Sequence, residues 1–469
     1  MNLDPRAFKD SAHDALNDVA LKGALGRLKT HFVLRRQETI ARYGDFETLR
    51  EAGRAIRDHA VANLDSMLEI FERNVTARGG QVHWARDAGE ARAVILKILQ
   101  DSGARTVTKG KSMVTEEIEL NPFLQANGIV PIETDLGEYI IQLRREPPSH
   151  IIAPAFHLHK EQVEETFREA HTALDPTRIL DERSALVAEA RTMLRASFEA
   201  ADAGITGANF LSAADGAAVI VTNEGNGDLT RLLPRTHIVV TGIEKVVADL
   251  DEVAVLLRLL TRSATGQEIS TYVSVMSGPR ARESDEGQTA FHVVLVDNGR
   301  SKLIGTEAQE VLRCIRCAAC LNHCPIYGAI GGHAYGATYP GPIGAALNPG
   351  TMGLARAHHH PNASTFCGRC AEVCPVKIPL PTIMRHWRAK EYADGLAPRA
   401  AVMGLGLLAF AAKHPALYRF ATRIAARMLK LLAGKRGAVR ALPLMGGWFA
   451  VRDFPAPQGR TFQELWRKR

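Results

Sequence analysis

The stretch "VLRCIRCAACLNHCPIYGAIGGH", residues 311–333, places four cysteines within eleven positions of a chain that has only seven in 469 residues. A second stretch, "STFCGRCAEVCPVKIP" at 364–379, holds the other three. An odd number of cysteines confined to one short region is a poor disulfide framework for a chain of this length. The clustering therefore indicates a metal site in a reducing compartment.

The first set has the spacing CxxCxxCxxxCP, which is typical of bacterial ferredoxins. In that arrangement three thiolates bind one [4Fe-4S] cluster, and the fourth, which precedes the proline, binds the other cluster of a pair. A structural zinc site is the less favoured alternative. The set comprises Cys314, Cys317, Cys320 and Cys324, followed by Pro325.

The second set fits the last three places of the same template, and its first place falls on Ser364. One thiolate is therefore missing. With the crossed ligand pattern of paired clusters, we expect one complete cluster and one cluster with only three cysteines. The complete cluster would take Cys314, Cys317, Cys320 and Cys374, and the second would take Cys324, Cys367 and Cys370.

The incomplete set leaves three outcomes open. It could hold a [3Fe-4S] cluster, which needs only three thiolates. It could hold a [4Fe-4S] cluster whose fourth iron takes Ser364, water, a nearby histidine or a substrate. It could also hold a labile [4Fe-4S] cluster that loses iron. A plain relay centre is favoured over substrate chemistry at an open iron.

Two segments between the cysteine sets also contain residue types that bind or tune metals. The loop at 331–344 is rich in Gly and Pro, so its backbone N–H groups could approach the cluster sulfurs. Its side chains His333, Tyr335 and Tyr339 could tune or ligate a cluster. The run "HHH" at 358–360 resembles a metal-binding tract, but we expect a solvated loop there.

The composition is that of an ordinary globular protein, with 46% apolar and 23% charged residues. The length allows two or three domains. The N-terminus has no apolar core of a secretory signal, and the longest apolar run, at 401–412, is too short for a membrane-spanning helix. These features predict a cytoplasmic protein.

Positive charge is concentrated in the C-terminal segment. From Arg385 onward, 17 Lys and Arg face only four Asp and Glu. The segment 416–437 predicts a basic amphipathic helix that could contact a partner groove or the inner face of a membrane. A solvated face above a core-facing stripe is the alternative, and nucleic-acid binding is the weakest interpretation. Arg419, Arg423 and Arg427 form one face, and Phe420, Ile424, Met428 and Leu431 form the other.

The pattern of apolar residues predicts four regions along the chain. Residues 1–80 read as helical, and residues 81–300 alternate short β-rich runs with helices, as in an α/β domain with a largely parallel sheet. A Cys-, Gly- and Pro-rich region follows at 305–382, for which we expect a helical, ferredoxin-like iron–sulfur domain. Residues 383–469 form the basic helical segment.

Several specific stretches resemble the lactate utilization protein B family: "TKGKSMVTEEIELN", "IETDLGEYIIQL", "CIRCAACLNHCPIYGAIGGHAYGATYPGPIGA", "FCGRCAEVCPVKIPLP" and "WFAVRDFPAPQGRTFQELW". The resemblance covers nearly the whole chain. It implies that the α/β region is a LUD domain with a NagB/RpiA/CoA-transferase-like fold. It also implies a subunit of a three-protein system that oxidises L-lactate to pyruvate, with the other subunits as partners.

Within such a system, this chain is expected to relay single electrons to an acceptor that the sequence does not identify. It shows no GxGxxG fingerprint and no flavin or nicotinamide signature, so the hydride from lactate would be accepted elsewhere or at an unrecognised site. The alternative is an enzyme that acts on an organic acid or thioester at the LUD domain, beside an open iron.

Candidate ligand-binding residues of the LUD domain lie in three polar segments where strands are expected to end. These segments could equally be structural turns and helix caps. CoA-transferase chemistry would need a carboxylate nucleophile, for which Glu224 is the only candidate. The segments contain Thr108, Lys109 and Lys111, then Glu133, Asp135 and Glu138, and finally Asn223, Glu224 and Asn226.

Overall fold

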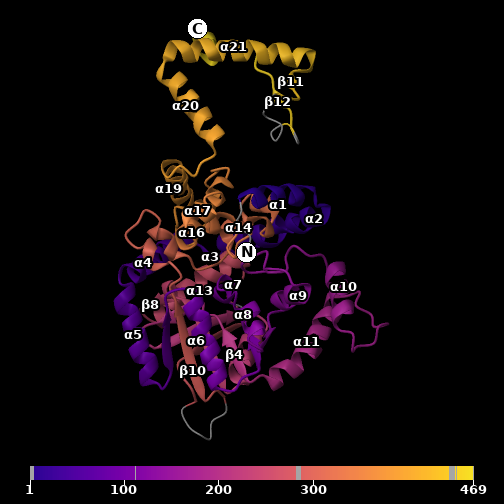
Figure 1. Ribbon diagram of the computed structural model, residues 1–469, viewed down its shortest axis with the longest axis vertical. Coiled ribbons are helices and arrows are strands. Elements are labelled where there is room, and N and C mark those ends of the chain that lie inside the picture. The colour runs from indigo at the N-terminus through magenta and orange to yellow at the C-terminus, as the bar shows by residue number, and fades with distance from the viewer. Residues whose placement is uncertain (1–4, 111, 281–286, 443–448, 450–451, 468–469) are drawn as a thin grey trace. The chain divides into compact units, whose positions relative to one another are not determined.

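The computed structural model describes the chain except residues 1–4, 111, 281–286, 443–448, 450–451 and 468–469 (Figure 1). The chain divides into two compact units, Met1–Glu391 and Tyr392–Arg469. The cysteines and the candidate ligand residues all lie in the first unit.

Helices form the start of the first unit. Two of them begin at aspartate caps: Asp18 accepts the Leu21 N–H before α2, and Asp45 accepts the Thr48 N–H before α4. Their apolar stripes pack into the main core of the unit. The elements are α1 (Pro5–Asn17), α2 (Val19–Leu28), a π-helical turn (Lys29–Val33), α3 (Leu34–Tyr43), α4 (Phe46–Ala62) and α5 (Leu64–Ala77).

A six-stranded parallel sheet forms the centre of the unit, with the order β1-β10-β7-β4-β2-β3. Its inner strands are buried along their length, as expected when helices cover both faces. The predicted α/β class with a parallel sheet is therefore confirmed. The strands are β1 (Gln81–Ala85), β2 (Thr106–Lys109), β3 (Val130–Glu133), β4 (Ala203–Thr206), β7 (Thr236–Gly242) and β10 (Ala290–Val296).

A second sheet has four strands in the order β8-β5-β6-β9. The pairs β5-β6 and β6-β9 are antiparallel, and the pair β5-β8 is parallel. Its strands are β5 (Phe210–Ser212), β6 (Ala217–Thr222), β8 (Val246–Val247) and β9 (Tyr272–Met276). The helices of this region are α6 (Ala88–Asp101), α7 (Met113–Glu117), α8 (Leu120–Ala126), α9 (Leu136–Arg144), α10 (Lys160–Ala170), α11 (Arg183–Ala200), α12 (Asn226–Leu232) and α13 (Leu250–Ala264).

The cysteine-rich region consists of short helices joined by turns. It shares one hydrophobic core with the N-terminal helices and the sheets, since Cys317 and Cys374 belong to the same buried cluster as Phe71 and Val239. The fit is close, because a Cβ at Gly332 would overlap the carbonyl oxygen of Ser149. The helices are α14 (Ala319–Asn322), α15 (Tyr327–Ile330), α16 (Gly341–Thr351), α17 (Leu354–Ala357), α18 (Arg369–Glu372) and α19 (Leu380–Ala393).

The expectation of a solvated loop at the histidine run 358–360 is wrong. His359 and His360 are buried. The His360 ring lies between the Asn348 side chain and the Tyr335 carbonyl oxygen, at 3.1 and 2.9 Å. The Phe8 ring of α1 packs against the rings of both His359 and His360. The histidines are thus packed against the N-terminal helix, which sequence spacing does not reveal.

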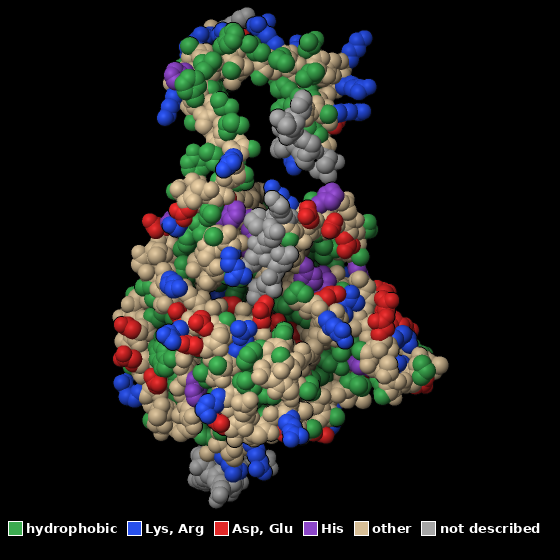
Figure 2. All heavy atoms as spheres, in the orientation of Figure 1, with side chains coloured by type: hydrophobic (Ala, Val, Ile, Leu, Met, Phe, Trp, Pro, Cys, Tyr) green, Lys and Arg blue, Asp and Glu red, His purple; other side chains and the backbone are tan. Residues whose placement is uncertain are grey.

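In its described part, the C-terminal unit has α20 (Arg399–Lys413) and α21 (Pro415–Ala433), followed by the short strands β11 (Ala438–Val439) and β12 (Phe454–Pro455) and by α23 (Phe462–Trp466). Many of its hydrophobic side chains are exposed (Figure 2). No single described helix has the length and apolar composition of a membrane span. The pair Arg399–Lys413 and Pro415–Arg436, bent by 114°, meets those criteria only when its two helices are taken together.

Candidate metal centres and an adjoining pocket

The seven cysteines line two separate cavities in the first unit. The last cysteine of each motif lies with the other motif's set, so the two loops exchange one cysteine each. Cys314, Cys317, Cys320 and Cys374 line the four-cysteine cavity. Cys324, Cys367 and Cys370 line the three-cysteine cavity, together with Ser364 and His323.

The two motifs share an unusual backbone conformation. Arg316 and Ala318 have φ angles of 60° and 58°, and their counterparts Phe366 and Gly368 have φ angles of 52° and 84°. Each pair of left-handed residues precedes a one-turn helix, α14 or α18. Such alternation turns successive backbone N–H groups toward one side, where they form a concave site for anionic atoms. The repeated conformation therefore suits two thiolate-ligated clusters.

Backbone N–H groups donate to several of the cysteine sulfurs. The donors are Arg316 to Cys314 at 3.4 Å, Tyr327 to Cys324 at 3.5 Å and Ile378 to Cys374 at 3.3 Å. These bonds stabilise negative charge on sulfur, and in iron–sulfur proteins they tune the reduction potential.

The burial of the thiols favours a bound cationic group. Burial raises the pKa of Cys317 and of Cys370 to about 12, and that of Cys374 to about 11. Thiolates at these positions need nearby positive charge, which the iron ions of a cluster supply. The residues present therefore fit iron–sulfur clusters. Cys367, in the three-cysteine set, is the one exposed cysteine of the seven.

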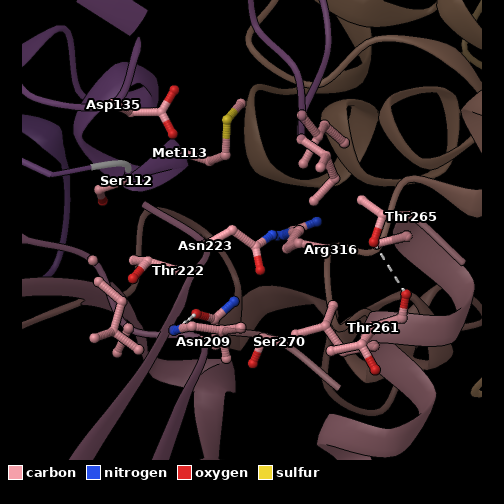
Figure 3. Close-up of a pocket in the computed structure, with 18 of the residues that line it drawn as sticks. Ser112, Met113, Asp135, Asn209, Thr222, Asn223, Thr261, Thr265, Ser270 and Arg316 are labelled. Atoms are coloured by element: carbon pink, nitrogen blue, oxygen red, sulfur yellow. Dashed lines mark hydrogen bonds between the residues drawn. The ribbon is translucent and has the colours of Figure 1, made fainter. Parts of the chain in front are cut away.

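A larger cavity of about 370 Å³ adjoins the four-cysteine cavity (Figure 3). It is formed by the ends of β6 and β7, by α13, and by Arg316 and Tyr339 from the cysteine-rich region. Arg316 and Ile151 line both cavities. The carboxyl ends of parallel strands are a common place for ligand sites. We call this cavity the interdomain pocket, because within the first unit it lies between the α/β region and the cysteine-rich region.

The structure brings four of the predicted ligand residues together in the interdomain pocket: Asp135, Asn223, Glu224 and Asn226. Two of them also have structural roles. Asp135 caps α9 by accepting the N–H of Gly137 at 3.0 Å. Asn223 accepts the N–H of Thr271 at 3.1 Å. Lys111 lies outside the described residues.

Lys109 and Glu133 lie apart from that pocket. Lys109 is fully buried, and its ammonium forms ion pairs of 2.8 Å with both Glu116 and Glu133. Glu138 is also buried near this group. Thr108 is buried too, and it lines neither the interdomain pocket nor the separate cavity of about 740 Å³ that includes Glu133 and Glu138.

The loop residues proposed to tune a cluster line neither cysteine cavity in the described part of the chain. The His333 ring bonds to the Pro147 carbonyl oxygen at 2.8 Å. The Tyr339 hydroxyl donates to Glu117 at 2.8 Å. Tyr335 is fully buried next to Phe8 and His360.

Sequence reasoning missed two cations of the interdomain pocket, Arg316 and Lys245. Arg316 stands inside the first cysteine loop, where a basic residue between two ligands is a signal that could have been used. Lys245 follows β7 in a 3-10 turn (Ile243–Lys245), and burial lowers its pKa to about 7. Their proximity depends on the contact between the sheet and the cysteine loop, which no local pattern reports.

The parallel α/β core and the two cysteine sets define an iron–sulfur protein. Residues 68–296 match the LUD domain family, 310–378 the 4Fe-4S dicluster domain family, and 390–469 the family "Lactate utilisation protein B, C-terminal". The chain belongs to the lactate utilization protein B family.

Curated relatives match over the full length. Lactate utilization protein B of Bacillus pumilus is 41% identical over 471 residues, covering 100% of this chain and 98% of the relative. The protein of the same name from Macrococcus caseolyticus is 41% identical over 473 residues, with the same coverage. A crystal structure of a duf162 family protein from Deinococcus radiodurans covers 50% of this chain and 98% of its own, at 12% identity and a TM-score of 0.27, which is too low to define a shared fold.

Proposed function

We propose that this protein is the iron–sulfur electron-transfer subunit of a complex that oxidises L-lactate to pyruvate. It would pass single electrons from a partner subunit to an acceptor. The observation that carries the proposal is the pair of neighbouring cysteine cavities within one compact unit, which share cysteines of both motifs. Membership of the lactate utilization protein B family supports the substrate.

Two clusters are proposed as cofactors. A [4Fe-4S] cluster would bind to the four-cysteine set, and a second [4Fe-4S] or [3Fe-4S] cluster would bind to the three-cysteine set. Each cluster, when bound, supplies a one-electron redox centre. The chain's own contribution is to exclude water and to hold the sulfurs in place.

Two arginines of the N-terminal helices position the second cysteine loop. The Arg36 guanidinium donates to the Val373 carbonyl oxygen at 2.9 Å. Arg50 donates to the Cys374 carbonyl oxygen at 2.8 Å. Because both acceptors lie in the turn that carries Cys374 across to the four-cysteine set, these bonds support the crossed arrangement.

The remaining proposals concern fold and location. The parallel sheet is compatible with a NagB/RpiA/CoA-transferase-like LUD domain, and we place the four regions at 1–80, 81–300, 305–382 and 383–469. We propose a cytoplasmic protein that touches the inner face of the membrane through α21. Within the C-terminal unit, Phe420, Met428 and Leu431 of α21 are 63%, 57% and 82% exposed, which favours a contact surface over a core-facing stripe.

A second candidate function is an enzyme that acts on an organic acid or thioester. The interdomain pocket favours it, since Glu224, the candidate nucleophile, lines that pocket. The pocket adjoins the four-cysteine set and shares no lining residue with the three-cysteine cavity. Chemistry at an open iron of the second cluster would therefore need another route for the substrate.

One experiment tests the relay against the enzyme. The full chain is purified without oxygen, and its iron, sulfide and low-temperature EPR spectra are measured before and after dithionite. We expect two reducible centres and no lactate oxidation by the lone subunit with an artificial acceptor. Turnover by the lone subunit, or clusters that do not change oxidation state, would contradict the relay.

A further inference from the structure

We propose that the interdomain pocket binds a small organic anion, whose carboxylate or phosphate group is held by Arg316 and Lys245. The inference deepens the proposed function by assigning a ligand beside the four-cysteine set. It rests on that function only for the redox role of the neighbouring cluster.

Arg316 carries a buried donor that lacks an acceptor. The residue is only 9% exposed, and its Nη2 donates to Glu244 at 3.1 Å. Its guanidinium stacks over the Tyr339 ring at 4.4 Å, which holds it in place. Its Nη1 is buried and has no hydrogen-bond partner among the residues that the structure describes. A buried charged donor without a partner is costly, so this position calls for an anionic acceptor.

Lys245 adds a second basic group to the same pocket, and a bound anion would hold its amine in the charged form. It is only 5% exposed, and no carboxylate of the described chain lies within ion-pair distance of its ammonium. The adjacent acid, Glu244, is already engaged by Arg316 and by Arg300, whose Nε lies 2.6 Å away. The cations here therefore outnumber the acids available to pair with them.

The acids that line the pocket do not cancel this charge. Asp135 is engaged at the start of α9, where it accepts the N–H groups of Gly137 and Glu138 at 3.0 and 3.3 Å. Glu224 is exposed at the end of β6, on the solvent side. The two cations of the pocket are therefore buried, and one of them, Arg316 (labelled in Figure 3), belongs to the first cysteine loop.

The rest of the lining sets the class of ligand. The lining combines apolar side chains with neutral polar ones, so an anion with an uncharged organic body fits better than a bare inorganic ion. A volume of about 370 Å³ lies in the range of small-molecule sites. The apolar residues include Phe32, Met113, Ile152, Ile220 and Leu260, and the polar ones include Asn209, Thr222, Thr241, Thr261, Thr265 and Ser270.

The position of Arg316 links the ligand to the four-cysteine set. Arg316 lies between Cys314 and Cys317, and it lines both the pocket and the cavity of that set. An anion on Arg316 would therefore alter the charge next to the cluster, and we expect it to lower the reduction potential of that centre. The alternative is that Arg316 and Lys245 only offset the charge of the thiolates.

Arg36 offers a matched control for this alternative. It is also buried, its Nε lacks a partner among the described residues, and the charges of Cys317 and Cys374 act on it. It does not line the interdomain pocket. If Arg316 and Lys245 only offset the thiolate charge, replacing them should affect the Kd of a probe no more than replacing Arg36 does. If they bind the ligand, replacing them should raise the Kd, and replacing Arg36 should not.

The test uses the anaerobically purified full chain with its clusters. Calorimetric titrations with L-lactate, pyruvate, phenylpyruvate, inorganic phosphate and phenyl phosphate give the Kd of each probe, and a redox titration gives the cluster potential with and without it. We expect saturable one-to-one binding of an organic carboxylate or an organic phosphate. Comparing the Kd of the carboxylate probes with that of phenyl phosphate shows which of the two groups the pocket binds. A bound probe should lower the reduction potential of one iron–sulfur centre, the one at the four-cysteine set.

Variants locate the site. Arg316→Gln and Lys245→Gln should each raise the Kd at least about tenfold. Because Arg36 also holds the Val373 carbonyl oxygen, Arg36→Gln is compared at equal iron content, and it should then leave the Kd within about twofold. Because Arg316→Gln alters a cysteine loop, Ser270→Trp provides a second variant that narrows the pocket away from that loop. It should abolish binding with unchanged iron content.

Two outcomes would overturn the inference: no saturable binding of any probe up to about 10 mM, or affinities that none of the pocket variants changes. Protein with two reducible centres but no probe binding would refute this inference and leave the relay intact. Protein that binds a probe but whose clusters do not cycle would refute the relay alone.

Discussion

His323 donates its Nδ1–H to the backbone carbonyl oxygen of Ala319, with an N···O distance of 2.8 Å. This bond fixes the tautomer, because a carbonyl oxygen can only accept. The other nitrogen, Nε2, is buried without a partner in the described part of the chain, on a residue that lines the three-cysteine cavity. Metal-ligating histidines are commonly held in this way by a carbonyl group at the far nitrogen.

The same cavity contains Ser364, which accepts the Phe366 N–H at 3.1 Å, just as Cys314 accepts the Arg316 N–H. Its hydroxyl would have to lose a proton to replace a thiolate. The His323 imidazole is already neutral, because burial lowers its pKa to about 4, so its Nε2 can bind iron without losing a proton. We therefore expect His323→Ala to lower the iron content and change the EPR spectrum of the second centre. Ser364→Ala should leave both unchanged, and the reverse pattern would assign the ligand to Ser364.

The two cysteine sets should be separable by mutation. Cys317→Ser should remove the centre of the four-cysteine set and destabilise the first unit, because Cys317 is buried in its main core. Cys367→Ser, at an exposed position of the other set, should remove only the second centre. EPR of the two reduced variants should show complementary losses. Loss of both centres in Cys367→Ser would contradict separate sites.

Arg57 should be important for stability although it touches no cysteine. It is fully buried, and it donates to the carbonyl oxygens of Glu244, Val246 and Leu312. Arg57→Met leaves these acceptors without a donor, so we expect a loss of about 3 kcal/mol or more in the free energy of unfolding. Urea unfolding measures it. The matched change Arg54→Met, on the exposed face of α4, should cost less than about 0.5 kcal/mol.

Glu138 should make the protein less stable as the pH rises. Burial, and then the charge of Glu133, raise the pKa of its carboxyl well above the usual value, and neither of its oxygens has a hydrogen-bond partner among the described residues. The folded chain keeps a proton there that the unfolded chain releases above about pH 4.3, so stability falls as the pH rises past that value.

The substitution Glu138→Gln removes this effect. Its gain in unfolding free energy over the parent should be about 1 kcal/mol or more at pH 8 and should vanish toward pH 4. Urea unfolding at both pH values measures the difference. Glu169→Gln, at an exposed position of α10, serves as the control. An equal gain at both pH values would show that the pKa of Glu138 does not differ between the folded and the unfolded chain.

The C-terminal helix α21 should bind anionic membranes. Each arginine near an anionic surface contributes about 1 kcal/mol, so replacing Arg419, Arg423 and Arg427 by Gln should weaken binding roughly a hundredfold. Sedimentation with vesicles of anionic lipid measures it, and neutral vesicles serve as the control. Equal binding of the parent and the variant to anionic vesicles would exclude a role for this basic face.

The cysteine motifs, the α/β class and the family could all be recognised from the amino-acid sequence. Ligand spacing is a local property, because the chain between two cysteines must wrap around one metal centre. The alternation of buried strands and amphipathic helices is also a local property, because each element is recognised from the spacing at which apolar residues recur along the chain. The histidine run at 358–360 does not form the expected solvated loop, because part of its burial comes from Phe8 of α1, which is distant in the sequence.

The partners of the charged residues depended on tertiary structure. Lys109 and Asp135 belong to equally polar segments, yet one is buried in ion pairs and the other lies in the interdomain pocket. Lys245 and Arg316 drew no attention in the sequence, but the contact of the 3-10 turn after β7 with the first cysteine loop, made by Glu244 and Arg316, places both in that pocket. Burial decides which charges need a partner, and burial arises only when distant segments pack together.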